Sequence, residues 1–272
     1  MQPWTTPILH DRVVVTGGGS GIGQGVALAL ADVGATVYVL GRRESALAAT
    51  QALADGASGT IVPVVCDVRK PEAVDAAFSR IEADGGSAPG LVHSAANVDY
   101  TPGSKMTSGG FATVVDSVLF GAFNTVQRWA APLIEAATPG VAAIVTSCIA
   151  SRGTPGAAHS SAGKAGIEAM MKTLAREWGP IGLRLNAIGP GFFPNERTAP
   201  LLGDREASAP IRELIALGRL GEPAEIVGPI MFLLSAAASY ITGEVLVTDG
   251  GFRLTPLVLP TWRFQSTAGT AD

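Results

Sequence analysis

The amino-acid sequence predicts an α/β fold in which one parallel sheet is flanked by helices on both faces. Short β-branched runs alternate with helical segments along the chain, and a glycine-rich turn joins the first run to the first helix. Because the alternation continues to Gly251 without a linker-like break, residues 1–272 are expected to form a single doubly wound domain. Its core is expected over about 11–251, with a C-terminal tail over 252–272.

The strands are expected where short apolar runs stand between turn residues. The seven expected runs are 12–16, 36–40, 60–66, 91–94, 141–147, 183–188 and 245–247. Helices are expected between them, from Ile22 to about Val33 and over 71–83, 111–137, 160–178 and 224–234. Gly34 ends the first helix and Pro71 begins the second, as helix-capping rules favour.

The turn after the first strand has the pattern of a nucleotide cradle. It runs Thr16-Gly17-Gly18-Gly19-Ser20-Gly21-Ile22-Gly23. Glycines let the backbone approach a pyrophosphate, and the following helix points its first N–H groups at that negative charge. The strand and helix stand where this motif requires them, so a plain glycine turn is the weaker alternative. The pattern predicts a Rossmann-type dinucleotide site with contacts from Gly17, Gly19, Ser20, Gly21, Ile22 and Gly23.

The end of the second strand favours NADP(H) as the cofactor. Arg42 and Arg43 follow Gly41, and no carboxylate precedes Glu44. Guanidinium groups suit a ribose 2′-phosphate, whereas an NAD site places a carboxylate here. The alternative is a pair of solvated charges at the start of the next helix.

Composition and residue spacing argue against several other kinds of protein. A net charge of −4 gives no reason to expect a nucleic-acid partner. Cys66 and Cys148 lack metal or redox spacing, so no metal is expected and both are interpreted as buried thiols. Residues 1–10 contain no apolar signal core, and the apolar stretch 226–241 is short and interrupted, which favours a packed helix over a membrane span. We therefore expect a cytoplasmic protein without a membrane partner.

Several motifs together resemble the short-chain dehydrogenase/reductase family from about Asp11 to Gly251. Besides the cradle they are Cys66-Asp67-Val68, Ser147, Lys164, the segment 186–191, Thr242-Gly243 and Asp249-Gly250-Gly251. The resemblance implies that Asp67 bonds the adenine amino group and that Val68 lies beside the ring. It also implies that Ile188, Pro190 and Gly191 line the nicotinamide side, and Ala95 is expected among the cofactor contacts.

Within that family, the segment around Lys164 is similar to the 2,4-dienoyl-CoA reductases. Ser160 stands four residues before Lys164, where other family members carry the tyrosine that donates the catalytic proton. The tyrosine and asparagine that polarise the thioester carbonyl in the dienoyl reductases correspond here to Ile149 and Phe120. Val118 stands where carbonyl reductases have an asparagine in a helix. The Asn-Asn-Ala-Gly segment after the fourth strand is replaced by His93-Ser94-Ala95-Ala96.

The expected catalytic residues are Ser147, Lys164, Ser160 and Tyr100. Lys164 lies one helical turn after Ser160, and its ammonium can hold the nicotinamide ribose of the cofactor and favour negative charge on a substrate oxygen. Ser147 can donate a hydrogen bond or simply cap the strand end. Ser160 is a poor acid and can equally fill the space of a lost ring. Tyr100 is either a surrogate donor or a surface-loop residue, and Asp99 and His159 are weaker candidates, the latter assigned to the helix entrance.

These residues predict an NADP(H)-dependent oxidoreductase that reduces a conjugated C=C bond or a carbonyl group of a small molecule without the tyrosine acid. Two alternatives remain: a nucleotide-binding sensor or structural subunit without redox activity, and a non-redox cyclase or lyase that uses the same pocket. The family resemblance also implies a homotetramer, or a dimer, formed through apolar surfaces in 111–137, 165–178 and 236–247.

Overall fold

All seven strands run parallel in one sheet, in the order β3-β2-β1-β4-β5-β6-β7. The computed structural model describes residues 10–96, 100–194, 198 and 202–254. The strands are β1 (Arg12–Thr16), β2 (Thr36–Gly41), β3 (Thr60–Val65), β4 (Gly90–His93), β5 (Gly140–Val145), β6 (Leu183–Pro190) and β7 (Val245–Thr248). This arrangement confirms the expected doubly wound sheet.

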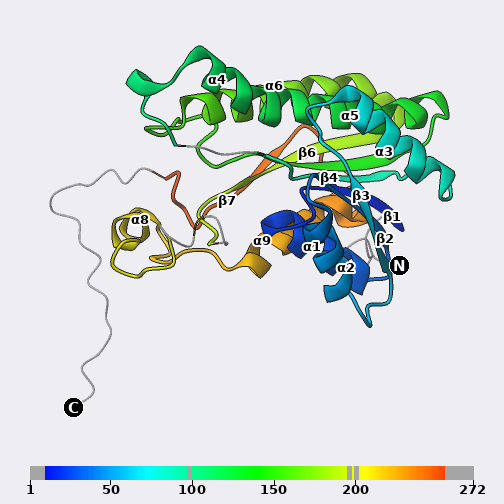
Figure 1. The fold of residues 1–272 in the computed structure, drawn as a ribbon, viewed down its shortest axis with the longest axis horizontal. Coiled ribbons are helices and arrows are strands. Elements are labelled where there is room, and N and C mark those ends of the chain that lie inside the picture. The colour runs from blue at the N-terminus through cyan, green and yellow to red at the C-terminus, as the bar shows by residue number, and fades with distance from the viewer. Residues whose placement is uncertain (1–9, 97–99, 195–197, 199–201, 255–272) are drawn as a thin grey trace.

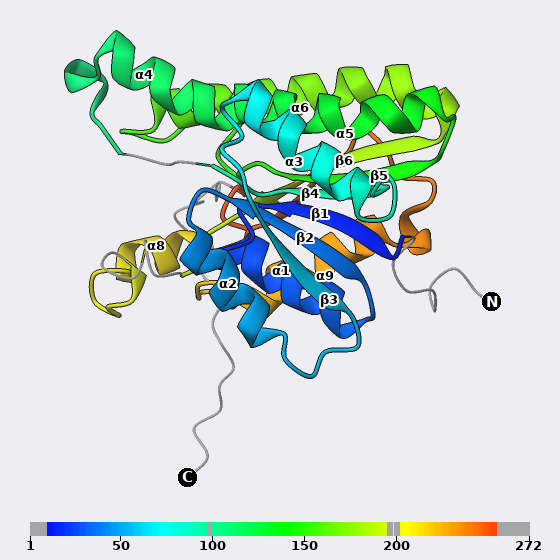
Figure 2. The ribbon, with the colours of Figure 1, turned by 45° about the vertical axis from the view of Figure 1, so that its right-hand side comes forward.

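Helices cover both faces of the sheet (Figures 1 and 2). One layer contains α1 (Gly21–Asp32), α2 (Glu44–Leu53) and α9 (Pro223–Leu234), and the other contains α3 (Pro71–Ala83), α4 (Ser108–Val115), α5 (Gly121–Glu135) and α6 (Ala158–Trp178). A short helix, α8 (Ala209–Leu214), lies beyond the carboxyl end of the sheet. The 3₁₀ turns are η2 (Gly103–Lys105), η4 (Gly179–Ile181) and η5 (Ala236–Ala238).

The core forms two apolar layers, one on each face of the sheet. One packs Val15, Val39 and Val92 against α1 and α9, and the other packs Leu91 of β4 with Trp129 of α5 and Ile167 of α6. Alternate residues of a strand point to opposite faces, which explains why neighbours in β4 belong to different layers.

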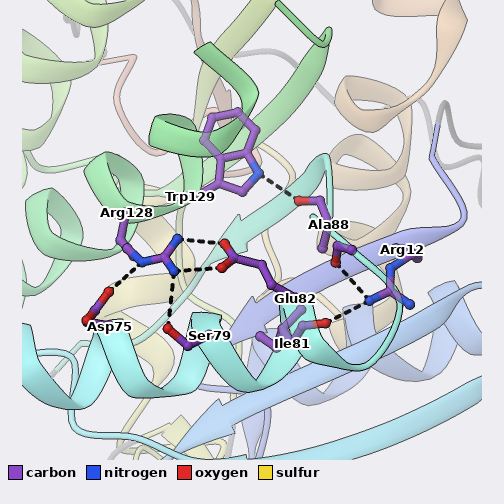
Figure 3. Close-up of polar contacts among 9 residues, drawn as sticks. Arg12, Asp75, Ser79, Ile81, Glu82, Ala88, Arg128 and Trp129 are labelled. Atoms are coloured by element: carbon purple, nitrogen blue, oxygen red, sulfur yellow. Dashed lines mark hydrogen bonds and ion pairs between the residues drawn. The ribbon is translucent and has the colours of Figure 1, made fainter. Parts of the chain in front are cut away.

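The helices α3 and α5 are also joined by polar contacts, which Figure 3 shows. The Arg128 guanidinium forms ion pairs with Asp75 at 2.8 Å and with Glu82 at 2.7 Å. The indole Nε1 of Trp129 donates to the Ala88 carbonyl at 3.0 Å, and Arg12 donates to the Ile81 carbonyl at 3.0 Å, near the end of α3. These contacts tie α5 to α3 and to the segment before β4, and α3 to β1.

The long helical stretch expected over 111–137 is present, as an unbroken helical segment over Ser108–Glu135. A π-helical turn, η3 (Asp116–Phe120), separates α4 from α5. A Cβ at Gly121 would lie 2.8 Å from Val68, and one at Gly163 would lie 2.9 Å from Val118. The helix is thus closely packed on both sides of the π-turn, where larger side chains would clash.

The stretch Ser108–Glu135 is long and apolar enough to cross a membrane by length and composition alone. In this structure it comprises α4, η3 and α5, and Val126, Trp129 and Leu133 of α5 are fully buried in the core against the sheet. Core helices of globular domains satisfy the same length and composition test.

Candidate functional site: a dinucleotide cradle and a buried lysine

The glycine cradle lies between β1 and α1, as expected. Gly17 and Gly21 have φ values of +69° and +56°, which favour glycine. A Cβ at Gly23 would lie 2.5 Å from the Gly17 carbonyl oxygen, so a side chain there would break the turn. Ser20, at the N-cap of α1, forms no side-chain cap bond, and the first turn of α1 contains no acidic residue. The close backbone approach and the uncapped helix end fit a pyrophosphate group.

At two further cradle positions a side chain would crowd its neighbours. A Cβ at Gly18 would lie 2.7 Å from the Val39 side chain, and one at Gly19 would lie 3.0 Å from Ala46. Ile22, in the first turn of α1, is half-buried and packs against the apolar core on that face of the sheet. The sequence motif thus corresponds to a tightly packed turn in the tertiary structure.

Charged groups gather where β2 and β3 end, on the adenosine side of the expected site. Arg42 and Arg43 are exposed, and among the described residues neither forms an ion pair. The Asp67 carboxylate accepts from Arg69 Nε at 2.9 Å and from Arg69 Nη2 at 2.5 Å. These hydrogen bonds, followed by the charges of Arg69 and Arg42, lower the pKa of Asp67 although partial burial opposes them.

Arg69 is a site-edge residue that the sequence analysis missed. Its spacing two residues after Asp67 was the available signal, because a long cationic side chain can fold back onto a carboxylate two positions away. Val68, between them, is buried, and its carbonyl oxygen accepts from the Asn124 side chain at 3.0 Å. The structure therefore anchors this segment to α5.

The segment after β4 closes one wall of the cradle. Thr16 Oγ1 accepts hydrogen bonds from the backbone N–H groups of Ser94 and Ala95, each at 3.1 Å. The same oxygen lies 3.1 Å from Nδ1 of His93. A Cβ at Gly17 would lie 2.9 Å from the Ala95 nitrogen, so this segment lies directly against the cradle.

Lys164 is buried in α6, only 5% exposed, beside the end of β5. Its Nζ donates to the Val145 carbonyl oxygen at 2.6 Å. Burial lowers the pKa of Lys164 to about 8. No carboxylate in the described part of the chain forms an ion pair with this ammonium, so its remaining N–H donors are available to a ligand.

The two candidate serines flank Lys164 on different elements. Ser147 follows β5, is half-buried, and accepts from the Ile149 backbone N–H through Oγ at 3.4 Å. Ser160 lies one turn before Lys164 in α6 and is 7% exposed. The backbone N–H of Ser160 donates to His159 Nδ1 at 2.8 Å, so that imidazole caps the first turn of α6. This places His159 at the helix entrance, as expected.

Tyr100 lies beside the β5–α6 loop but points mostly to solvent. Its Cβ lies 3.8 Å from a Cβ built at Gly156, and 58% of its surface is exposed. Among the described residues no hydrogen bond joins its hydroxyl to Ser147, Ser160 or Lys164. Asp99 lies outside the described residues.

The segment expected to line the nicotinamide lies at the end of β6. The Pro190 carbonyl accepts from the Cys148 N–H at 3.0 Å, and Gly191 N–H donates to the Thr248 carbonyl at 2.8 Å. A Cβ at Gly191 would lie 2.6 Å from Asp249 Cα, which requires glycine there.

A small apolar cavity of about 90 Å³ lies next to this turn. Its lining includes Phe192, Phe193, Ile215, Leu217 and Leu220. Phe192 packs edge-on against Phe252 with ring centroids 4.9 Å apart. This wall suits an apolar ligand group beside the nicotinamide position.

Three apolar residues stand where the resemblance places polar groups in other family members, and they differ in burial. Val118 is fully buried against Gly163, Ile149 is half-buried near Ser147, and Phe120 is 54% exposed. The expected replacement of the family's polar groups by apolar side chains thus leaves one buried side chain, one half-buried and one exposed.

Comparison with known proteins shows which family this fold and these motifs belong to. A family model described as enoyl-(acyl carrier protein) reductase matches residues 17–253. A probable 2,4-dienoyl-CoA reductase of Bacillus subtilis is 36% identical over 90% of this chain and 97% of its own length. The peroxisomal 2,4-dienoyl-CoA reductase of Pongo abelii is 34% identical, over 91% of this chain and 86% of its own.

Solved structures agree with this assignment. A short-chain type dehydrogenase/reductase from Mycobacterium marinum superposes with a TM-score of 0.83 at 31% identity, over 89% of this chain and 95% of its own. The fold and site define an oxidoreductase with a doubly wound sheet. The chain belongs to the short-chain dehydrogenase/reductase family.

Proposed function

We propose that this protein is an NADP(H)-dependent reductase that adds hydride to a conjugated C=C bond of an enoyl thioester, or to a carbonyl group of a small molecule. The observation that carries the proposal is the buried ammonium of Lys164, which has no ion pair within the described ranges and is bound to the last residue of β5, two residues before Ser147, while Ser160 lies one turn away on the same helix. Relatives described as 2,4-dienoyl-CoA reductases support the C=C reading. A 3-oxoacyl-[acyl-carrier-protein] reductase of Chlamydia muridarum, 33% identical over 90% of this chain and 98% of its own, supports the carbonyl reading.

The cofactor choice rests on Arg42 and Arg43. Both guanidinium groups are exposed at the end of β2 and are free of ion pairs within the described ranges. A 2′-phosphate would give these planar guanidinium forks a doubly charged partner. A structure described as actinorhodin polyketide ketoreductase with NADPH, 25% identical with a TM-score of 0.83 over 89% of this chain and 96% of its own, shows this cofactor on the same fold.

When bound, the cofactor supplies the hydride. The residues of this chain act on the oxygen of the substrate. Lys164 already donates one N–H to Val145, and its remaining donors can hold the ribose and favour negative charge on that oxygen. Ser147 can donate a further hydrogen bond, and Ser160 can polarise the group but does not release its own proton near neutral pH.

Reduction of an activated C=C bond makes the smaller demand on an acid. Hydride forms a bond to the β-carbon, the electron pair of the C=C bond moves to the thioester oxygen as an enolate, and water then supplies the proton to the α-carbon. A ketone instead needs a proton at oxygen, which Ser160 at the tyrosine position is poorly suited to give. We therefore favour the enoyl reaction.

The test is oxidation of NADPH, followed by absorbance, with matched panels of enoyl thioesters, dienoyl thioesters and ketones. We expect turnover with a conjugated thioester and incorporation of one solvent deuterium at the α-carbon in D₂O. Binding of NADPH without turnover on any panel would favour a sensor or structural role. Conversion of substrate without net NADPH oxidation would favour a cyclase or lyase.

We further propose a homotetramer, with a dimer as the second possibility. Phe111, Phe120 and Phe123 are exposed along α4, η3 and α5, while Phe232 and Tyr240 are exposed near α9 and η5. Exposed apolar groups on two separate faces suit two kinds of subunit contact. A monomer mass by light scattering at micromolar concentration would contradict this proposal.

A cytoplasmic location and the lack of membrane and nucleic-acid partners also stay proposals, for which cell fractionation and nucleic-acid binding assays are the direct tests.

A further inference from the structure

His93 is a buried titratable residue to which the proposed chemistry gives no role. It ends β4, is 1% exposed, and pairs in register with Thr16 of β1, the residue that opens the cradle. Burial, and then the charge of Lys164, lower its pKa to about 3. The imidazole is therefore neutral at physiological pH and unsuited to act as the missing acid.

The hydrogen bonds of Thr16 determine which ring nitrogen carries the proton. A hydroxyl group has two acceptor lone pairs and one proton. Thr16 Oγ1 accepts from the Ala95 N–H and shares the Ser94 N–H with the Thr16 carbonyl oxygen, which leaves its own proton to point at His93 Nδ1, 3.1 Å away. His93 is thus an acceptor at Nδ1 and carries its hydrogen on Nε2.

This bond is the one that orients the ring. His93 Nε2 is buried and has no hydrogen-bond partner among the described residues. The Thr16 hydroxyl is the side-chain partner of the ring, and an interaction with the Ala95 backbone adds to it, so that ring and hydroxyl hold each other in place. Loss of the acceptor would leave the Thr16 hydroxyl free to rotate and to donate elsewhere, at the expense of its bonds to Ser94 and Ala95.

Those two N–H groups belong to the wall that touches the cradle. A Cβ at Gly17 would lie 2.9 Å from the Ala95 nitrogen and 3.0 Å from the Ser94 carbonyl carbon. A small displacement of this wall therefore changes the space at Gly17, where the backbone approaches the expected pyrophosphate.

We propose that His93 is a positioning residue of the dinucleotide site, which acts by accepting the Thr16 proton and so holding Ser94 and Ala95 against Gly17. This inference rests on the proposed use of a dinucleotide cofactor. It adds a residue that neither contacts the cofactor nor takes part in proton transfer, but sets the geometry of the cradle.

The first test is the tautomer of His93 in the native protein. Long-range ¹H–¹⁵N spectra should show the pattern of a neutral Nε2–H ring, unchanged between about pH 5 and pH 9. The signal is assigned by its loss in His93→Asn. A ring protonated on Nδ1, or one that titrates near its ordinary pKa, would overturn the inference without reference to activity.

The second test is a double-mutant cycle on NADPH affinity. His93→Leu should weaken the dissociation constant about three- to tenfold, because one buried hydrogen bond is lost. His93→Asn should recover most of this loss, since Asn Oδ1 lies as far along the side chain as His Nδ1. In a Thr16→Val background, His93→Leu should change the affinity less than about twofold.

Leu91→Val is the matched control, because Leu91 is fully buried on the same strand and the same face as His93. It should lower the stability in urea without changing NADPH affinity. Equal weakening by Leu91→Val and His93→Leu, or an unchanged His93→Leu effect in the Thr16→Val background, would refute the positioning role. NADPH binding by the native protein without any reduction would contradict the proposed function alone, while the cycle would still decide the role of His93.

Discussion

The Nζ atom of Lys164 lies 2.6 Å from the carbonyl oxygen of Val145, and this contact joins the middle of α6 to the last residue of β5. It holds a buried ammonium at the carboxyl end of the sheet, where ligands bind in open α/β folds. A backbone carbonyl carries only a partial charge, so it leaves the cation without full compensation. The buried ammonium of Lys164 is therefore expected to lower the free energy of unfolding and to strengthen the binding of a ligand.

Lys164→Met should stabilise the protein in the absence of cofactor. The folded-state pKa of Lys164 is about 8, below its usual value of 10.5, so the unfolded chain binds this proton more tightly. The wild-type stability should consequently rise as pH increases from about 8 to 10.5, by on the order of 3 kcal/mol if no other group intervened. Urea unfolding at pH 7 and pH 10 should show this rise in the wild type and a smaller one in Lys164→Met.

The exposed Lys172 on the same helix provides the control. Lys172→Met should leave the pH dependence of unfolding as it is in the wild type. The same Lys164→Met variant should bind NADPH poorly, because the donors offered to the ribose are lost. A variant with unaltered stability and affinity would contradict both expectations.

Arg42→Ala should weaken NADPH binding by about 10- to 100-fold and leave NADH binding within about twofold. The expected loss is that of a charge-assisted hydrogen bond to a 2′-phosphate, a group that NADH lacks. Calorimetric titration with both cofactors measures it, and Arg43→Ala should have the smaller effect. Equal losses for the two cofactors, or a native preference for NADH, would exclude the 2′-phosphate assignment.

Gly163→Ala should destabilise the fold by about 1–3 kcal/mol through overpacking. Its Cβ would lie 2.9 Å from Val118, a fully buried side chain on η3. Adding Val118→Ala should relieve the clash, so that the double variant is more stable than the sum of the two single changes predicts. Gly109→Ala in α4, where no atom lies within 4 Å of the new Cβ, should be neutral or slightly stabilising in the same urea experiment.

Turnover should depend on Ser147 more than on Ser160. Ser147→Ala removes a donor expected to bond the substrate oxygen chiefly in the transition state, a loss of about 10²–10³ in kcat. Ser160→Ala should cost less than tenfold, since the serine is not the acid. Tyr100→Phe removes only a hydroxyl that faces solvent in this structure and should retain near-native kcat. A larger loss with Tyr100→Phe than with Ser147→Ala would identify Tyr100 as the surrogate donor.

Cys66 and Cys148 should resist alkylation in the folded protein. Burial raises the pKa of Cys66 to about 11 and that of Cys148 to about 12, and only the thiolate reacts. Incubation with iodoacetamide at pH 8 followed by mass measurement should show no modification of either thiol until urea is added. Rapid labelling of the native protein would show that these thiols are accessible.

The sequence by itself determined the alternation of strands and helices and the place of the cradle. Both follow from local rules: β-branched runs favour strands, and glycine at positions such as Gly17 and Gly21 permits positive φ. The expected strand runs therefore agree with the observed strands to within two residues at each end. The sequence pattern also selected Lys164, because its spacing from Ser160 puts both on one side of α6.

Tertiary structure decided what these residues contact, because the partners are far apart along the chain or carry no sequence signal. The acceptor for Lys164 is a backbone carbonyl, which any residue at position 145 would provide. The π-turn between α4 and α5 was also not visible in the apolar periodicity, which only indicates a helix. The protonation state of His93 likewise follows from how many hydrogen bonds Thr16 accepts, which became countable only once β1 and β4 lay side by side.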